Sequence, residues 1–309
     1  MSYPHYPFAS HRFQVRPGIA MHYLDEGPRD GEVLLMLHGN PSWSYYWRHA
    51  VLGLRDRYRC IVPDHVGMGL SDKPDDAHYR YTLQSRVEDI GALLQHLDVR
   101  DTITLVVHDW GGMIGFGWAL QHAAAVRRLV LLNTAAFPMP SKKRLPWQLK
   151  LGRDLAIGAL LIRGCNAFAQ GAARFAVRRR MAPDERRALV SPYNSWANRI
   201  ATLRFVQDIP LSPDDPAWAL VEASGKHLHA FADRPCFIGW GMRDFVFDHH
   251  FLDQFIQALP QAEVQRFAEG GHYILEDEAA ALVPAMRAFL DRNPCRPDQA
   301  TGRNPGRSP

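Results

Sequence analysis

The chain has 309 residues, of which 47% are hydrophobic and 22% charged, as is usual for a globular protein with a large core. Its apolar runs, such as residues 155–162, are far shorter than the roughly 20 residues that a membrane-spanning helix needs. Residues 1–13 lack the apolar stretch of a signal peptide, so we expect a cytoplasmic protein. The cysteines are widely separated and favour free thiols over a metal site or disulfides: Cys60, Cys165, Cys236 and Cys295.

The charge is distributed unevenly. The formal net charge is +4, but residues 141–190 contain 12 Lys or Arg against 3 Asp or Glu, a net +9 that leaves −5 for the rest. This basic block is either a solvated helical face or a surface for an acidic partner, an anionic ligand or a membrane. No nucleic-acid-binding motif accompanies it, so we do not expect a nucleic-acid partner.

Strand-like and helix-like segments alternate along most of the chain. Strands are predicted at residues 13–16, 19–24, 33–37, 58–62, 103–107, 128–132, 235–240 and 263–267. Helices are predicted at residues 43–54, 83–97, 113–122, 249–259 and 278–292. The first two strands form an antiparallel pair. The alternation that follows predicts an α/β fold, with a mostly parallel eight-stranded sheet covered by helices on both faces.

One block interrupts this alternation. Residues 138–231 show helical patterns and Pro-rich loops without a convincing strand, which predicts a helical cap inserted between the sixth and seventh strands. The core domain is then formed by residues 1–137 and 232–292. Residues 293–309 are polar and rich in Pro, Gly and Arg, so we expect a disordered tail there.

A carboxylate stands at the corner between a predicted core strand and a predicted core helix. The segment TITLVVHDWGGMIGFGWAL, residues 102–120, places Asp109 where a strained strand-to-helix turn would lift a nucleophile above the sheet. Gly111 and Gly112 give the turn room, although Val107 replaces the first glycine of the common G-x-S-x-G pattern. Taken alone, DWGG is also compatible with an Asp that merely caps the helix.

Other strand ends supply matching groups. Asn40 follows the third strand, in the loop that contributes an oxyanion N–H in such folds. Asp244 follows the seventh strand, where an orienting acid belongs, and His272 follows the eighth. The chain order of nucleophile, acid and histidine is that of α/β-hydrolases, so we expect Asp109, Asp244 and His272 to converge.

The motifs HGNPSWSYYWR, PDHVGMGLSDKP, YTLQSRVEDI, HDWGGMIGFGWAL, NTAAFPMP and RFVQDIPL carry a resemblance over residues 3–293. The sequence resembles the haloalkane dehalogenase-like group of α/β-hydrolases, and within it the β-lactone decarboxylases of bacterial long-chain olefin biosynthesis. The resemblance implies an α/β-hydrolase fold with a cap. It also implies conversion of long-chain cis-β-lactones to cis-olefins with loss of CO₂, without a metal or cofactor.

An Asp carboxylate can displace a leaving group from saturated carbon and form an ester of its own side chain. His272 would then activate water, and Asp244 would fix its tautomer. A leaving anion beside a carboxylate needs neutral N–H donors, which Trp110 and the Asn40 amide can supply. In dehalogenases this pair holds the halide; here it could hold a ring oxygen or a departing carboxylate. Which lactone carbon Asp109 attacks, and whether water takes part, stay open.

Three other functions compete with this one. A haloalkane dehalogenase would use the same halide-binding groups. An epoxide hydrolase normally needs two cap tyrosines, whereas residues 138–231 contain only Tyr193. A non-enzymatic scaffold would be expected to lose a member of the triad, and none is lost. The partners expected are a small apolar substrate and, through the basic cap, other olefin-pathway enzymes or a membrane surface.

Several further polar residues are expected to be structural. We expect Asp248 to cap the helix that starts near His249. His38 and His108 should be packed and hydrogen-bonded, and Asp64 should shape its loop beside Gly67 and Gly69. Asn133 stands where some dehalogenases carry their acid, which supports Asp244 in that role. The cap aromatics are expected in the core, with a few lining the pocket: Trp147, Phe168, Phe175, Trp196 and Phe205.

Overall fold

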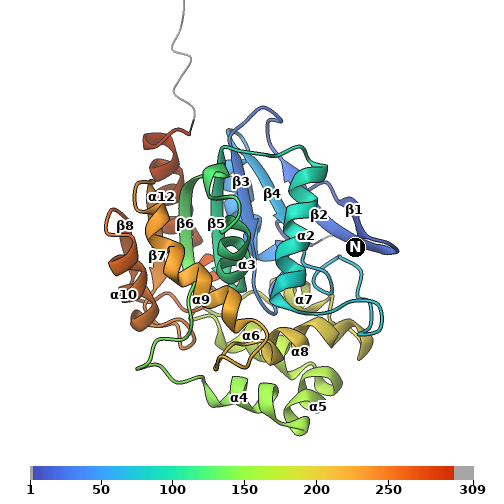
Figure 1. Cartoon of the computed structure of the whole chain (residues 1–309). Coiled ribbons are helices and arrows are strands. Elements are labelled where there is room, and N and C mark those ends of the chain that lie inside the picture. The colour runs from blue at the N-terminus through green and yellow to red at the C-terminus, as the bar shows by residue number, and fades with distance from the viewer. Residues whose placement is uncertain (1–2, 296–309) are drawn as a thin grey trace, which may run out of the picture.

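The computed structural model describes residues 3–295, and an eight-stranded sheet lies at its centre (Figure 1). The strands are β1 His11–Arg16, β2 Ile19–Glu26, β3 Val33–Leu37, β4 Arg59–Pro63, β5 Ile103–Asp109, β6 Val126–Thr134, β7 Cys236–Gly241 and β8 Glu263–Phe267. They are ordered β1-β2-β4-β3-β5-β6-β7-β8 across the sheet. β2 runs antiparallel to both of its neighbours, and every other pair is parallel. The predicted fold class is confirmed.

Helices cover both faces of the sheet, which explains why every residue of β3 and β5 is buried. The core helices are α1 Arg48–Leu54 after the 3₁₀ turn η1 Ser44–Trp47, α2 Leu83–His96, α3 Trp110–Ala119, α10 His249–Ala258, α11 Ile274–Asp277 and α12 Ala279–Arg292; a short 3₁₀ turn, η2, spans Ala123–Ala125. α2 and α3 pack together on one face, and α1 and α12 pack together on the other. β1 and β8 are the two edge strands, and their side chains are accordingly more exposed.

The insertion between β6 and β7 consists of helices joined by loops. It contains α4 Trp147–Asp154, α5 Ala156–Cys165, α6 Ala167–Phe175, α7 Pro183–Val190, η3 Ala197–Arg199, α8 Ile200–Gln207, α9 Trp218–His227 and η4 Leu228–Phe231. α4 to α8 lie beyond the carboxyl ends of the strands, at the bottom of Figure 1, whereas α9 returns to pack on α3. The predicted cap boundary at residue 231 stays a prediction. Among residues 3–295 no helix has the length and hydrophobicity to cross a membrane.

Buried ion pairs attach the cap to the core. The Arg48 guanidinium is fully buried and bonds both carboxylate oxygens of Glu276, at 2.6 and 2.7 Å, and Glu185 of α7 at 3.2 Å. Arg86 of α2 donates to Asp208, at the end of α8, at 2.7 Å. Removing one partner of such a pair leaves a buried charge without a counterion and typically lowers the free energy of unfolding by about 3–5 kcal/mol. Buried ion pairs, in addition to apolar contacts, therefore hold the cap over the carboxyl ends of the strands.

Two of the predicted boundaries that move concern the site and the end of the core domain. The helix expected at 113–122 begins at Trp110, because the turn at Asp109 leads straight into α3. Residues 293–295 are held on the core, where Arg128 donates to the Asn293 carbonyl and the Cys295 N–H donates to Glu32. The remainder of the predicted disordered tail, residues 296–309, lies outside the described residues.

Candidate active site

The turn between β5 and α3 holds Asp109 in a strained conformation, with φ 54° and ψ −126°. Such a backbone is rare for a residue with a Cβ and costs roughly 1–3 kcal/mol, which the surrounding packing must offset. The Asp109 side chain makes no capping hydrogen bond to α3, so the alternative of a simple helix cap is wrong. Glycines permit the turn: a Cβ at Gly111 would collide with the Leu37 carbonyl, and one at Gly39 with the Asp109 carboxylate.

The two oxygens of the Asp109 carboxylate have different surroundings. Oδ1 accepts a hydrogen bond from the Asn40 backbone N–H at 2.7 Å. Oδ2 lies 3.6 Å from His272 Nε2. The Thr134 hydroxyl donates to the Asp109 carbonyl at 2.6 Å and so fixes the turn from β6. These contacts hold Oδ1 on the Asn40 backbone N–H and present Oδ2 to the imidazole.

His272 bridges two carboxylates. Its Nδ1–H donates to Asp244 Oδ2 at 2.9 Å, while Nε2 faces Asp109. Asp244 Oδ1 in turn accepts from the backbone N–H groups of Val246 and Phe247, at 2.7 and 3.1 Å. The structure thus brings together Asp109, Asp244 and His272 from the ends of β5, β7 and β8. Their catalytic roles stay predictions.

Burial and charge together set the ionisation of this group. Burial raises the pKa of Asp109 above its ordinary value, although His272 and the backbone N–H groups of Trp110 and Asn40 act in the opposite direction. Burial alone would lower the pKa of His272, but the carboxylates of Asp244 and Asp109 outweigh it, so that pKa is raised. The arrangement favours an imidazolium held between two carboxylates, each of which supports its charge.

A cavity of about 520 Å³ lies between cap and sheet, above the Asp109 carboxylate. This volume is within the range of small-molecule sites. Asp109, His272, Asn40 and Trp110 form its inner end. Most of the remaining wall is apolar and includes Met113, Phe137, Met139, Leu149, Leu151, Leu161, Ile162, Phe168, Val206, Ile209, Phe247 and Phe251. Such a wall suits an apolar substrate.

The two predicted N–H donors differ in their surroundings. Trp110 is buried at the cavity wall, and no protein acceptor within residues 3–295 bonds its indole N–H. The Asn40 amide instead donates to the Thr202 carbonyl of α8 at 3.0 Å, which leaves one amide hydrogen for the cavity. Both residues line the cavity that also contains Asp109. Asn40 also ties the oxyanion loop to the cap.

The cap aromatics divide between cavity, core and surface. Trp147, Phe168 and Phe175 line the cavity, and Phe205 is buried against the Trp110 ring. Trp196 is half exposed, so its predicted core position is wrong. Tyr193 is buried with its hydroxyl on the Ser42 carbonyl at 3.3 Å, away from the cavity wall.

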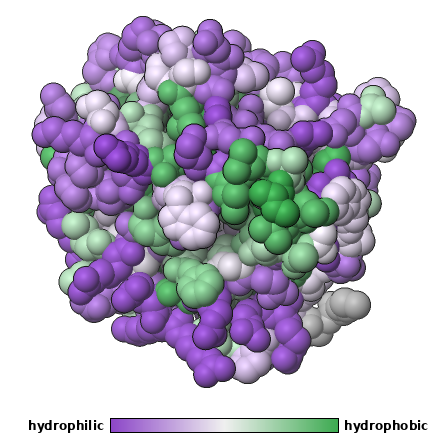
Figure 2. Space-filling model, turned by 90° about the horizontal axis from the view of Figure 1, so that it is seen from below, coloured by the Kyte–Doolittle hydropathy of each residue, from purple (hydrophilic) through white to green (hydrophobic). Residues whose placement is uncertain are grey.

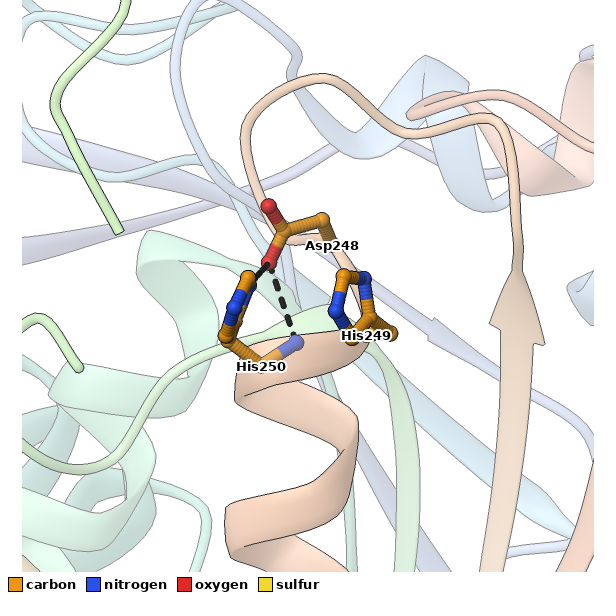
Figure 3. A group of neighbouring side chains, drawn as sticks. All are labelled: Asp248, His249 and His250. Carbon is orange, nitrogen blue, oxygen red and sulfur yellow. Dashed lines mark hydrogen bonds and ion pairs between the residues drawn. The ribbon is translucent and has the colours of Figure 1, made fainter. Parts of the chain in front are cut away.

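Asp248, His249 and His250 are the one group of potential metal ligands found within residues 3–295 (Figure 3). Asp248 caps α10 by accepting from the His250 backbone N–H at 3.0 Å, as predicted, and the same oxygen meets His250 Nδ1 at 3.1 Å. Its other oxygen accepts from the Lys143 ammonium at 2.8 Å. A neighbouring ammonium opposes cation binding, so helix capping accounts for this cluster.

The other polar residues of the elbow region are held in hydrogen bonds, as expected for His38, His108 and Asp64. Asn133 exchanges two hydrogen bonds with the Gly241 backbone and so clips β6 to β7. His108 Nε2 donates to the His272 carbonyl at 2.8 Å, and His38 bonds the Gly39 carbonyl. Asp64 accepts the backbone N–H groups of Ser44 and Leu70, which orders the loop around it.

Sequence reasoning missed Asp277. Its buried carboxylate accepts N–H groups from Gly271, beside His272, and from Arg178 and Arg179 of the cap, at 2.8–3.0 Å. It therefore joins the histidine loop to the cap. The only signal in the sequence was its place in the acidic run Glu276-Asp277-Glu278, and such a run does not identify the partners of its middle residue.

The family follows from comparison with known proteins. A family model described as alpha/beta hydrolase fold matches residues 32–279, which is most of the chain. The chain belongs to the α/β-hydrolase family. The position of Asp109 at the elbow and the insertion of the cap after β6 agree with this hydrolase architecture.

Two activities are represented among the relatives compared with this hydrolase. A cis-3-alkyl-4-alkyloxetan-2-one decarboxylase of Xanthomonas campestris is 63% identical over 95% of this chain and all of the relative. A protein of the same name from Shewanella oneidensis is 50% identical over 92% of this chain and 89% of the relative. A haloalkane dehalogenase of Mycobacterium marinum is 33% identical over 90% of this chain and 92% of the relative. The crystal structure of haloalkane dehalogenase DbeA from Bradyrhizobium elkani superposes with TM-score 0.84 at 25% identity, over 92% of this chain and 98% of that one.

Proposed function

We propose that this hydrolase converts cis-β-lactones bearing two alkyl chains into cis-olefins and CO₂, with Asp109 as nucleophile. The observation that carries the proposal is the 63% identity to a cis-3-alkyl-4-alkyloxetan-2-one decarboxylase along the full length of that relative. The site supports it chemically. A carboxylate, rather than a serine hydroxyl, stands at the elbow beneath an apolar cavity of about 520 Å³.

Asp109 Oδ2 is the attacking oxygen, because Oδ1 is held by the backbone N–H of Asn40. This oxygen attacks the saturated ring carbon that is bonded to the ring oxygen. The bond between that carbon and the ring oxygen breaks, an aspartyl ester forms, and the lactone carbonyl group becomes a free carboxylate. The Trp110 indole N–H and the remaining Asn40 amide hydrogen are the neutral donors for this anion.

Loss of CO₂ then completes the reaction. The bond between the carboxyl carbon and its neighbouring ring carbon breaks, and its electron pair forms the alkene while the Asp109 ester oxygen leaves. The free aspartate is restored, and neither water nor an oxidant is consumed. Inversion in the first step followed by anti elimination in the second keeps the two alkyl groups cis. The imidazolium of His272, 3.6 Å from Asp109 Oδ2, supports the departing carboxylate.

Haloalkane hydrolysis is the second candidate, favoured by the 33% identity to a haloalkane dehalogenase and by the free indole N–H of Trp110. In that reaction His272 would activate water against the aspartyl ester. Epoxide hydrolysis has less support, because the single cap tyrosine, Tyr193, is bonded to Ser42 away from the cavity.

The location and partners of the protein also belong to this proposal. The hydrolase acts in the cytoplasm on a small apolar substrate. The basic cap serves as a docking surface for other olefin-pathway enzymes or for a membrane. The excess of 12 basic over 3 acidic residues in the segment 141–190 supports a docking role for the cap.

Product analysis tests the proposed reaction. Purified protein would be incubated with a long-chain cis-β-lactone and, separately, with a bromoalkane of similar length, and products would be identified by gas chromatography and mass spectrometry. We expect cis-olefin from the lactone, at a kcat/KM well above that for bromide release. A faster haloalkane reaction without any olefin would favour the second candidate.

A further inference from the structure

The outer face of the cap carries an exposed apolar patch. Its members are large aliphatic or aromatic side chains, each more than a third exposed: Trp147, Leu155, Ile157, Leu160, Leu161 and Phe175, here called the cap patch. Figure 2 shows hydrophobic side chains gathered near the middle of this face, with hydrophilic ones around them. Ile157, Leu160 and Leu161 recur at helical spacing, so one face of α5 is turned to water. A patch of this kind marks an interaction site.

The cavity reaches the surface within the cap patch. Trp147, Leu161 and Phe175 line the cavity and are also exposed, at 70%, 37% and 68%. The same side chains thus form the outer end of the apolar cavity and part of the apolar surface. An apolar molecule resting on the cap patch can enter the cavity without crossing open water.

Exposed basic residues flank members of the cap patch along the chain. Exposed basic residues include Lys142, Arg144, Lys150 and Arg174. The acidic Asp154 nearby is already paired with Lys150 and Arg153. Each basic residue close to an anionic bilayer contributes roughly 1 kcal/mol of attraction. The net −5 of the remaining chain would be repelled by the same surface, so the charges favour one orientation, with the cap toward the lipid.

We propose that the cap patch docks on an anionic lipid bilayer, and that the cavity exchanges apolar substrate and product directly with that bilayer. The inference rests on the proposed function, because a lactone with two alkyl chains and its olefin product both partition into lipid. α5 has ten residues with its apolar side outward, which is the form of a helix that lies in the membrane interface. Trp147 suits the headgroup region, where indole rings concentrate.

Vesicle co-sedimentation tests the proposal on the full-length protein. The probes are vesicles of phosphatidylcholine alone and vesicles with phosphatidylglycerol added. The test variant Ile157→Glu/Leu160→Glu alters two patch residues that do not line the cavity, and Leu52→Glu on α1 is the matched control. A charge variant, Arg144→Glu/Arg174→Glu, alters two exposed basic residues of the cap. Its matched control is Arg100→Glu/Arg127→Glu, near the amino ends of β5 and β6 and therefore far from the cap.

We expect wild-type protein to bind the phosphatidylglycerol vesicles, and more weakly as salt is raised. Each test variant should lower binding by about tenfold or more, and the controls by less than about twofold. An environment-sensitive dye on Cys165, the one exposed cysteine among the described residues, should shift to the blue on these vesicles. Turnover of a short-chain, water-soluble lactone should be unchanged in both test variants, which shows that they fold.

Three results would overturn the docking proposal. These are an absence of wild-type binding to anionic vesicles, equal losses in test and control variants, or dimerisation in light scattering that only Ile157→Glu/Leu160→Glu abolishes. The last result would assign the cap patch to a second copy of the chain. Failure of the proposed function is distinguishable, because it would remove lactone turnover from wild-type protein whether or not vesicles bind.

Discussion

Asp244→Asn replaces the acid that orients His272 by a group of the same shape. The backbone N–H groups of Val246 and Phe247 donate to Asp244 Oδ1, so the oxygen of the new amide must stay on that side. Its NH₂ group then faces His272 Nδ1, which can no longer donate and must accept. The single proton then lies on Nε2 of a neutral ring. The imidazolium that supports the departing Asp109 carboxylate is lost, because its carboxylate partner 2.9 Å away is gone.

Loss of the orienting acid in comparable triads costs about 10⁴-fold in kcat, or about 5 kcal/mol in activation free energy. We expect a loss of that order in olefin formation from a cis-β-lactone, with a melting temperature close to that of wild type because the shape is kept. Asp248→Asn is the matched control, since this carboxylate caps α10 outside the triad. Activity of Asp244→Asn within tenfold of wild type would refute the proposed role of Asp244.

Four further predictions concern the nucleophile, the donor, the cavity and a buried carboxylate. Asp109→Ala should lower kcat by on the order of 10⁴-fold or more while circular dichroism stays unchanged; comparable turnover would end its assignment as nucleophile. Trp110→Phe keeps the ring and removes the N–H, so kcat should fall by about 10²-fold, and unchanged kinetics would show that the donor is dispensable. Each methylene added to the substrate should raise kcat/KM by about fourfold until the cavity of about 520 Å³ is full, and a flat series would contradict burial of the chains there. Burial would raise the pKa of Asp64, but His22 and backbone N–H groups lower it to about 2, so Asp64→Asn should cost about 2 kcal/mol in unfolding free energy above pH 5. This difference in unfolding free energy should shrink as the pH falls from 4 toward 2. Denaturant titrations at several pH values measure it, with the exposed Asp253→Asn as the control. A difference that stays constant down to pH 2 would contradict the prediction.

The sequence predicted the elements and the strand ends well, because local patterns determine both. The fully apolar run 103–107 and the glycines after Asp109 sufficed to predict a buried strand, a tight turn and a core helix. The parallel strands β5, β7 and β8 then place Asp244 and His272 at the same end of the sheet as Asp109, beyond the carboxyl ends of the strands. The convergence of distant residues therefore followed from fold class alone.

Side-chain contacts between cap and core could not be predicted in this way. The bond from the Asn40 amide to the Thr202 carbonyl joins residues 162 positions apart, and Asp277 reaches the cap through backbone N–H groups that no residue type identifies. The exposed position of Trp196 was missed for the same reason, since an aromatic residue in a helical segment is usually buried. These features depend on how the cap packs on the core.

Turnover of a cis-β-lactone in ¹⁸O-labelled water, followed by mass spectrometry of both the product and the Asp109 peptide, tests the central claim most directly. Elimination with loss of CO₂ consumes no water, so the account predicts a cis-olefin and an unlabelled Asp109 carboxylate. A bromoalkane serves as the comparison, because hydrolysis of its aspartyl ester would place ¹⁸O in Asp109. A β-hydroxy acid as the lactone product, with ¹⁸O in the Asp109 carboxylate, would contradict the account and identify a hydrolase acting through water.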